Sequence, residues 1–78
     1  MKTVGQILSI ERNSKNFSIR DIEIELKIPK NIIIDLENDN IKNNSDIIFN
    51  IGHLRSYSNL LELDTNAIIE KFKDELSF

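Results

Sequence analysis

Apolar side chains recur along this 78-residue chain at helical spacing, and short polar junctions separate one apolar stripe from the next. Positions three or four residues apart share one face of a helix, whereas a half-buried strand alternates apolar and polar residues. The stripes are Val4, Ile7 and Leu8; Ile19, Ile22 and Leu26; Ile33 and Leu36; Ile47, Ile51 and Leu54; and Ile68, Ile69, Phe72 and Leu76. They predict five helices, no strand, and a single all-α domain over residues 1–78.

Capping residues indicate where the predicted helices begin and end. Thr3 with Gln6, and Ser18 with Asp21, have the three-residue spacing of a capping box. Asn16 suits the positive φ that often ends a helix. Pro29 is expected in the first turn of the third helix, which should end at Glu37–Asn38. The fourth helix should be capped by Ser45 or Asp46 and run to about Leu61, and Asp64 should cap the fifth helix.

The composition excludes several classes of protein. The chain has no cysteine, so it contains neither thiolate zinc ligands nor disulfides. His53 is the only imidazole, and a single imidazole supports neither a zinc site nor a catalytic triad. No apolar run approaches the length of about 18 residues that a membrane helix needs. We therefore expect no metal, no cofactor, no enzymatic activity, and no direct membrane contact from this segment.

Only a short turn at Lys27 and Ile28 separates the second and third predicted helices, which is helix-turn-helix spacing. The chain resembles a known family from about Thr3 to Phe72, a range that includes this turn. The motifs are TVGQIL, LKIPKN, LEN, GHLRSYSNLLELD and IIEKF, and the fourth is the most specific. They resemble the cytoplasmic N-terminal helix-turn-helix domain of RodZ proteins, which act in bacterial cell shape.

The resemblance implies a five-helix Cro/lambda-repressor-like bundle without catalytic activity. It also implies a protein partner, the actin-like filament protein MreB, which the RodZ family binds through its fourth helix. The positions concerned are Phe49 and His53, and Tyr57 follows them at the same spacing of four residues. An ion pair between Arg12 and Glu37 is implied as well, because the equivalent residues tie the first helix to the third in this superfamily.

Several positions depart from the family pattern. Glu11 and Glu23 stand where small residues are usual on buried stripes, and a buried carboxylate is costly. We expect the helices to rotate or splay slightly so that these carboxylates reach solvent. Ile10 and Ile24 stand where the family prefers glutamate, which is consistent with a local shift of the buried face. Gly52 is expected to allow close approach of a neighbouring helix. The loop before the fourth helix lacks the family's glycine at Asp39 and its Leu-Pro at Asn44–Ser45, so we expect a less rigid loop.

A DNA-binding regulator of the Cro-like type is the alternative interpretation. Its candidate contacts are Ser18, Lys27, Lys30, Asn31 and Ile34, because the start of the third helix enters the major groove in such proteins. Residues 29–39, however, contain one lysine against Asp35, Glu37 and Asp39. DNA affinity comes largely from neutralising phosphates, so the acidic third helix favours a protein partner.

Two surfaces should therefore distinguish these functions. On the fourth helix, the stripe of Phe49, His53 and Tyr57 is either core against the fifth helix or an aromatic contact patch around Phe49, the residue hardest to cover. On the third helix, Ile32 and Ile34 flank Ile33, and we expect at least one of the three to be exposed, either as a single surface residue or as part of an apolar surface for a partner or for self-association. If the chain belongs to a longer membrane-anchored protein, it would lie at the cytoplasmic face of the inner membrane; otherwise it would be a cytoplasmic relative. The oligomeric state is not predicted.

Overall fold

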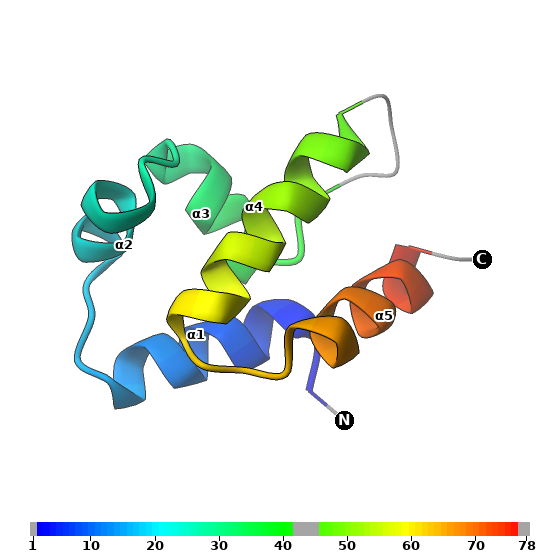
Figure 1. Cartoon of the computed structure of the whole chain (residues 1–78), viewed down its shortest axis with the longest axis horizontal. Helices are drawn as coiled ribbons and strands as arrows, with labels where there is room; N and C mark the ends of the chain where they lie inside the picture. Colours follow the sequence, from blue (N-terminus) through cyan, green and yellow to red (C-terminus); the bar gives the residue numbers. More distant parts are fainter. Residues whose placement is uncertain (1, 42–45, 77–78) are drawn as a thin grey trace.

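Helices account for nearly all of the regular structure in the computed structural model, which describes residues 2–41 and 46–76. In those residues the elements are α1 Val4–Ser14, α2 Ile19–Leu26, α3 Lys30–Glu37, α4 Ile47–Leu60 and α5 Thr65–Leu76, with no strand. The predicted all-α class is therefore confirmed. In Figure 1, α4 crosses in front of the bundle between α2 and α3 on one side and α5 on the other.

The capping predictions for the first two helices are confirmed. The Thr3 side chain accepts a hydrogen bond from the Gln6 backbone and the Gln6 side chain accepts one from the Thr3 backbone. Ser18 and Asp21 make the same reciprocal pair at the start of α2. Each box satisfies two backbone N–H groups that the first helical turn leaves without partners. At the start of α5, Asp64 accepts from the backbone of Ala67 at 3.2 Å, also as expected.

The junctions between the helices hold two further details. Asn16 has a φ of 61°, as predicted, and Lys27 adopts the left-handed conformation that ends α2. Pro29 is the N-cap of α3 and therefore lies just before the first helical turn. Asp46 is the N-cap of α4, and the alternative cap Ser45 and the Asn44–Ser45 departure lie outside the described residues.

The core collects one buried stripe from each helix. α1 packs against α3 and α5, α2 packs against α3 and α4, and α4 packs against α5. The least exposed apolar side chains are Val4, Leu8, Ile22, Ile33, Leu54, Tyr57 and Leu61. Ile41 packs against this core from the segment after α3, as an apolar anchor.

The expected shift of the buried face toward Ile10 and Ile24 is wrong, although the Glu11 and Glu23 side chains do reach solvent in part. Ile10 is 49% exposed and Ile24 is 61% exposed, so neither helix turns these isoleucines inward. The carboxylates are half-buried and find donors without such a turn: Glu11 pairs with Lys15 at 3.2 Å, and Glu23 accepts from the Lys30 backbone at 3.2 Å. A hydrogen-bonded carboxylate near the edge of the core avoids most of the cost of burial.

Two expectations about small-scale packing are also wrong. Gly52 faces open space, with nothing within 4 Å of where a Cβ would stand, so no helix approaches it. The close approach occurs at Gly5, whose backbone lies against the Glu37 carbonyl. Ile32 and Ile34 are both half-buried, and Ile32 packs against the core, so the expected exposed isoleucine on α3 is not found.

Candidate protein-binding and nucleic-acid-binding surfaces

The outward side of α4 carries the largest exposed apolar side chains in the described residues. Ile48 is 78% exposed and Phe49 is 73% exposed. The exposed positions that share this side, which we call the α4 outer face, are Ile48, Phe49, Gly52, Arg55, Ser56 and Asn59. Their spacing of three, four and seven residues is that of one helical face. His53 is half-buried beside them.

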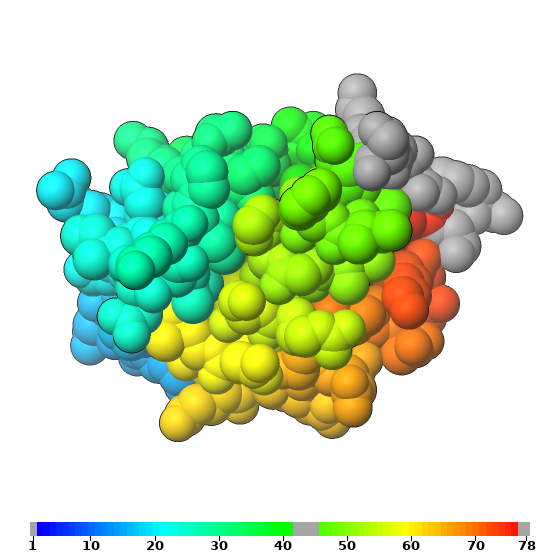
Figure 2. Space-filling view, turned by 45° about the horizontal axis from the view of Figure 1, so that its top comes forward, coloured from blue at the N-terminus to red at the C-terminus, as the bar shows by residue number. Residues whose placement is uncertain are grey.

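The opposite side of α4 holds the helix in place. Leu54 and Ser58 are buried and Ile47 and Ile51 pack against the core, as the sequence predicts. Figure 2 shows α4 lying across the middle of the molecular surface, with α2 and α3 to one side and α5 to the other. Anchored helices of this kind can present side chains to a partner without losing their own fold. Phe49 and Ile48 therefore occupy a surface available for binding.

Tyr57 does not belong to that surface, which corrects its assignment as a contact residue. Its side chain is 0% exposed. Eight residues advance a helix by about 800°, which places Tyr57 roughly 80° around the axis from Phe49. Its hydroxyl donates to the Glu37 carboxylate instead of facing a partner. Burial, and secondly this hydrogen bond, raise the pKa of Tyr57.

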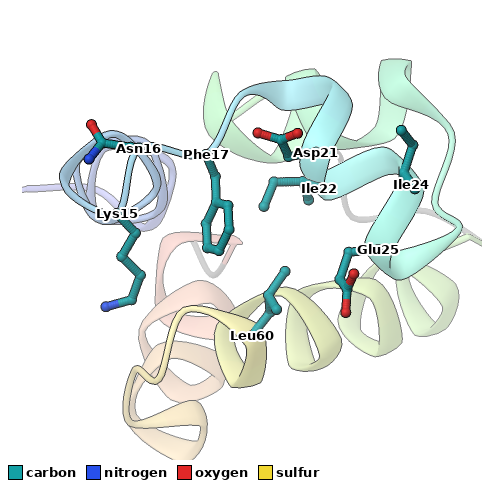
Figure 3. Close-up of a pocket in the computed structure, with 8 residues that line it drawn as sticks. All are labelled: Lys15, Asn16, Phe17, Asp21, Ile22, Ile24, Glu25 and Leu60. Atoms are coloured by element: carbon teal, nitrogen blue, oxygen red, sulfur yellow. The ribbon is translucent and has the colours of Figure 1, made fainter.

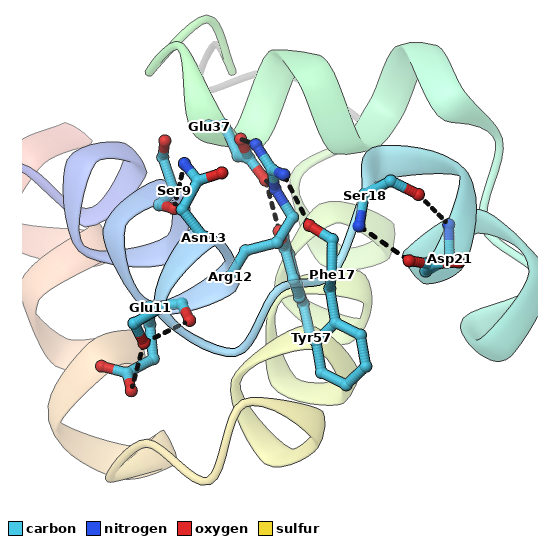
Figure 4. Close-up of polar contacts among 10 residues, drawn as sticks. Ser9, Glu11, Arg12, Asn13, Phe17, Ser18, Asp21, Glu37 and Tyr57 are labelled. Carbon is cyan, nitrogen blue, oxygen red and sulfur yellow. Dashed lines mark hydrogen bonds and ion pairs between the residues drawn. The ribbon is translucent and has the colours of Figure 1, made fainter.

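Arg12 and Glu37 form a bidentate ion pair next to the Tyr57 hydroxyl. Arg12 Nε donates to Glu37 Oε2 at 2.7 Å and Nη2 donates to Oε1 at 3.0 Å. A third donor, Nη1, contacts the Phe17 carbonyl at 2.9 Å. The hydrogen bonds to Glu37 raise the pKa of Arg12, against the opposing effect of burial. Figure 4 shows these side chains converging from α1, α3, α4 and the segment between α1 and α2.

Of the candidate DNA contacts, Lys27, Lys30 and Asn31 lie around the turn between α2 and α3, whereas Ser18 caps the start of α2 and Ile34 lies within α3. Ser18, Lys27, Lys30 and Asn31 are exposed, and Ile34 is half-buried. The Ser18 hydroxyl is already engaged, because it accepts from the Asp21 backbone at 3.0 Å. The hydrogen bonds between these two residues lower the pKa of Asp21. Two lysines and an amide therefore remain exposed at the start of α3.

The structure changes the charge argument against DNA. Of the three acids counted near α3, Glu37 is only 6% exposed at its side chain and is paired with Arg12. Asp39 accepts from the Gly5 backbone at 2.9 Å, at the start of α1. Arg12 therefore neutralises one of the three acids, whereas Asp39 is exposed and keeps its charge. A further acid, Glu23, lies at the start of α3, where its carboxylate accepts from the Lys30 backbone at 3.2 Å, so negative charge remains beside Lys30.

Residues 2–41 and 46–76 offer neither a metal site nor a membrane-spanning helix. These residues contain no group of three or more histidine, aspartate or glutamate side chains placed to hold a metal ion. None of their helices combines the length and the apolar character needed to cross a membrane.

Comparison with known proteins identifies the class. The family model of a helix-turn-helix domain matches residues 7–68, which include all of α2, α3 and α4. The chain therefore belongs to this helix-turn-helix domain family. Searches of curated proteins and of solved structures give no match.

Proposed function

We propose that this helix-turn-helix domain is a non-catalytic protein-binding module of the RodZ type. Its partner would be the actin-like filament protein MreB, and the α4 outer face would make the contact. The domain would link the filament to a membrane anchor elsewhere in the protein, at the cytoplasmic face of the membrane. The observation that carries the proposal is the exposure of Phe49, at 73%, on a helix whose other side is fixed in the core.

The chemistry of the α4 outer face supports a protein partner. Large apolar side chains concentrate binding energy when a partner desolvates them, and aromatic residues and arginine are enriched at such positions. Phe49 and Ile48 supply the apolar anchors, and Arg55 supplies a cation on the same face. α4 itself contains no acidic residue, so a partner surface with carboxylates would not be repelled.

Co-sedimentation with MreB filaments tests this function. Phe49→Ala should weaken co-sedimentation by about 30-fold, the effect of losing an interface anchor worth about 2 kcal/mol. The fold should survive, because the Phe49 side chain is mostly exposed in the free domain. Ile24→Ala is the matched control, since Ile24 is also a largely exposed apolar residue but lies on α2. Equal sedimentation of wild type and Phe49→Ala would reject the proposal.

Sequence-specific DNA binding is the second candidate function, and the exposed Lys27, Lys30 and Asn31 favour it. The pairing of Glu37 with Arg12 removes part of the electrostatic objection. A titration with random duplex DNA at low salt separates the two functions. Binding that weakens steeply with salt, and is reduced in Lys30→Ala, would support the regulator. The filament-binding function predicts no such binding in the micromolar range.

A further inference from the structure

A groove of about 560 Å³ opens between the segment that joins α1 to α2, α2 itself and the end of α4. Its floor is apolar: Figure 3 shows Phe17, Ile22 and Leu60 converging from these three parts of the fold. Ile22 is fully buried, whereas Phe17 and Leu60 are half-buried and remain open to contact. The volume lies within the range of about 300–1,000 Å³ that is typical of ligand pockets. The groove can therefore receive large apolar side chains.

The α2 wall of the groove is anionic. Asp21 and Glu25 line it, and Figure 3 shows the Glu25 carboxylate directed toward α4 beside the floor. α2 as a whole carries one arginine against three acids. Lys15 stands on the other side of the groove, where Glu11 holds it at 3.2 Å. The occupant that matches this site has apolar side chains and a cation beside them.

The start of α4 has those properties. Ile48 and Phe49 project from it, exposed by 78% and 73%. Arg55 lies seven residues further along the same face, about 10 Å from Ile48 along the helix axis. Figure 1 shows α4 beginning on the opposite part of the bundle from α2 and from the end of α1. The apolar pair of a chain therefore cannot fill that chain's own groove.

We propose that Ile48 and Phe49 of one chain dock into the groove of a second copy, with Arg55 facing Asp21 and Glu25. The two surfaces in this contact differ, so a dimer retains a free groove on one chain and a free apolar pair on the other. Such a contact is heterologous and builds head-to-tail chains of molecules. Two side chains bury a small area, which places the contact among weak and reversible interfaces, below about 1,200 Å². The inference does not depend on the proposed function, although Phe49 would serve both.

NMR spectra of the wild-type domain recorded as a function of concentration test the contact. With concentrations raised to about 1 mM, near the weak limit of measurable association, we expect shifts at two separated clusters. One cluster is Ile48 and Phe49, and the other is Phe17, Ile22 and Leu60. Shifts confined to Ile48 and Phe49 would indicate a symmetric contact and overturn the inference. Spectra that do not change with concentration would overturn it too.

Mixing two variants tests the head-to-tail arrangement. Phe49→Ser removes the apolar pair but keeps the groove, and Leu60→Glu places a charge on the groove floor but keeps the pair. Each variant alone should be monomeric in sedimentation equilibrium, whereas their mixture has one productive contact and should stop at a one-to-one dimer. A mixture that remains monomeric would reject the contact.

A charge exchange covers the case in which Leu60→Glu does not fold, because Glu25 and Arg55 are both exposed. Glu25→Lys alone and Arg55→Glu alone should each weaken association several-fold, and mixing the two should restore it. Failure of the mixture to restore association would count against the arrangement. Glu25→Lys should also co-sediment with filaments like wild type, so that loss of self-association and loss of filament binding can be told apart.

Discussion

At the scale of single residues, the fold depends on one polar cluster inside the bundle. Arg12, Glu37 and Tyr57 come from three helices, and Arg12 also holds the Phe17 carbonyl. A buried carboxylate is tolerated only when its oxygens have partners, and both Glu37 oxygens accept from Arg12. Removing Glu37 would leave the guanidinium and the phenol without their shared acceptor. The cluster therefore acts as one unit.

The ionisation of Tyr57 gives the first prediction. Burial, and then the hydrogen bond to Glu37, raise its pKa in the folded state, whereas the unfolded chain ionises near pH 10. Above that pH the unfolded state binds fewer protons than the folded state. Stability contributed by Tyr57 is thus fully present below about pH 10 and falls above it by up to about 1.4 kcal/mol per pH unit.

Urea unfolding between about pH 8 and about pH 11 measures this loss. Tyr57→Phe is the comparison: it should be less stable at neutral pH but should show a shallower alkaline decline. Lysine titration affects both proteins equally, so the difference isolates the phenol. Tyr57 is the only tyrosine, and tryptophan is absent, so phenolate absorbance reports this residue alone. Phenolate formation near pH 10 without unfolding would contradict the prediction.

Among single residues, the sequence predicts contacts between near neighbours but not contacts between distant positions. The capping boxes at Thr3 and Ser18 are predictable because both partners lie three residues apart. The hydrogen bond from Tyr57 to Glu37 joins positions twenty residues apart, and no local sequence pattern predicts it. The sequence pattern placed Tyr57 on the same face as Phe49, because both follow a spacing of four residues. Eight residues rotate about 80° beyond two full turns, so the two side chains point in different directions. Family resemblance supplied the Arg12 and Glu37 pair but not the third member.

At the scale of elements, apolar spacing located the helices but not the contacts between them. The stripes on α1, α2 and α5 predict which sides are buried, because burial repeats with the helical period. The close packing of α1 against the end of α3 depends on Gly5, whereas Gly52 on α4 has open space around it. The sequence favoured Gly52, since a glycine within a helix usually has a packing reason. Only the tertiary arrangement distinguishes the two glycines.

Alanine substitutions at these glycines should have opposite effects. A Cβ at Gly5 would lie 2.7 Å from the Glu37 carbonyl carbon and 2.8 Å from Asp39 Oδ1, so the backbone of α1 and α3 would have to separate. We expect Gly5→Ala to destabilise the domain by about 1–3 kcal/mol, as overpacking does. Gly52→Ala should stabilise it by about 1 kcal/mol, because alanine favours an exposed helix and meets no neighbour. Urea midpoints measure both, and shifts of the same sign would refute the argument.

At the scale of the whole molecule, the start of α1 joins distant parts of the chain. The first N–H groups of a helix lack helical partners and carry partial positive charge. Glu75, near the end of α5, accepts from the Val4 backbone at 3.0 and 3.3 Å. Asp39, after α3, accepts from the Gly5 backbone at 2.9 Å. These acceptors lie 71 residues from Val4 and 34 residues from Gly5 along the chain. No local sequence pattern predicts such contacts, so the packing of α5 and of the segment after α3 against the start of α1 was not predictable.

Neutralising Glu75 should therefore weaken the packing of α5 against α1. We expect Glu75→Gln to lower the free energy of unfolding by about 0.5–1 kcal/mol at low salt, because a neutral amide interacts less with the helix start and no longer forms the ion pair with Lys71 at 3.6 Å. The loss should shrink as salt rises, since screening already weakens the charged contact. Asp74→Asn is the matched control: it removes the same charge from an exposed neighbouring position and should change stability by less than about 0.5 kcal/mol. Equal losses in the two variants, measured by urea unfolding at low and high salt, would mean that net charge acts rather than the contact with Val4.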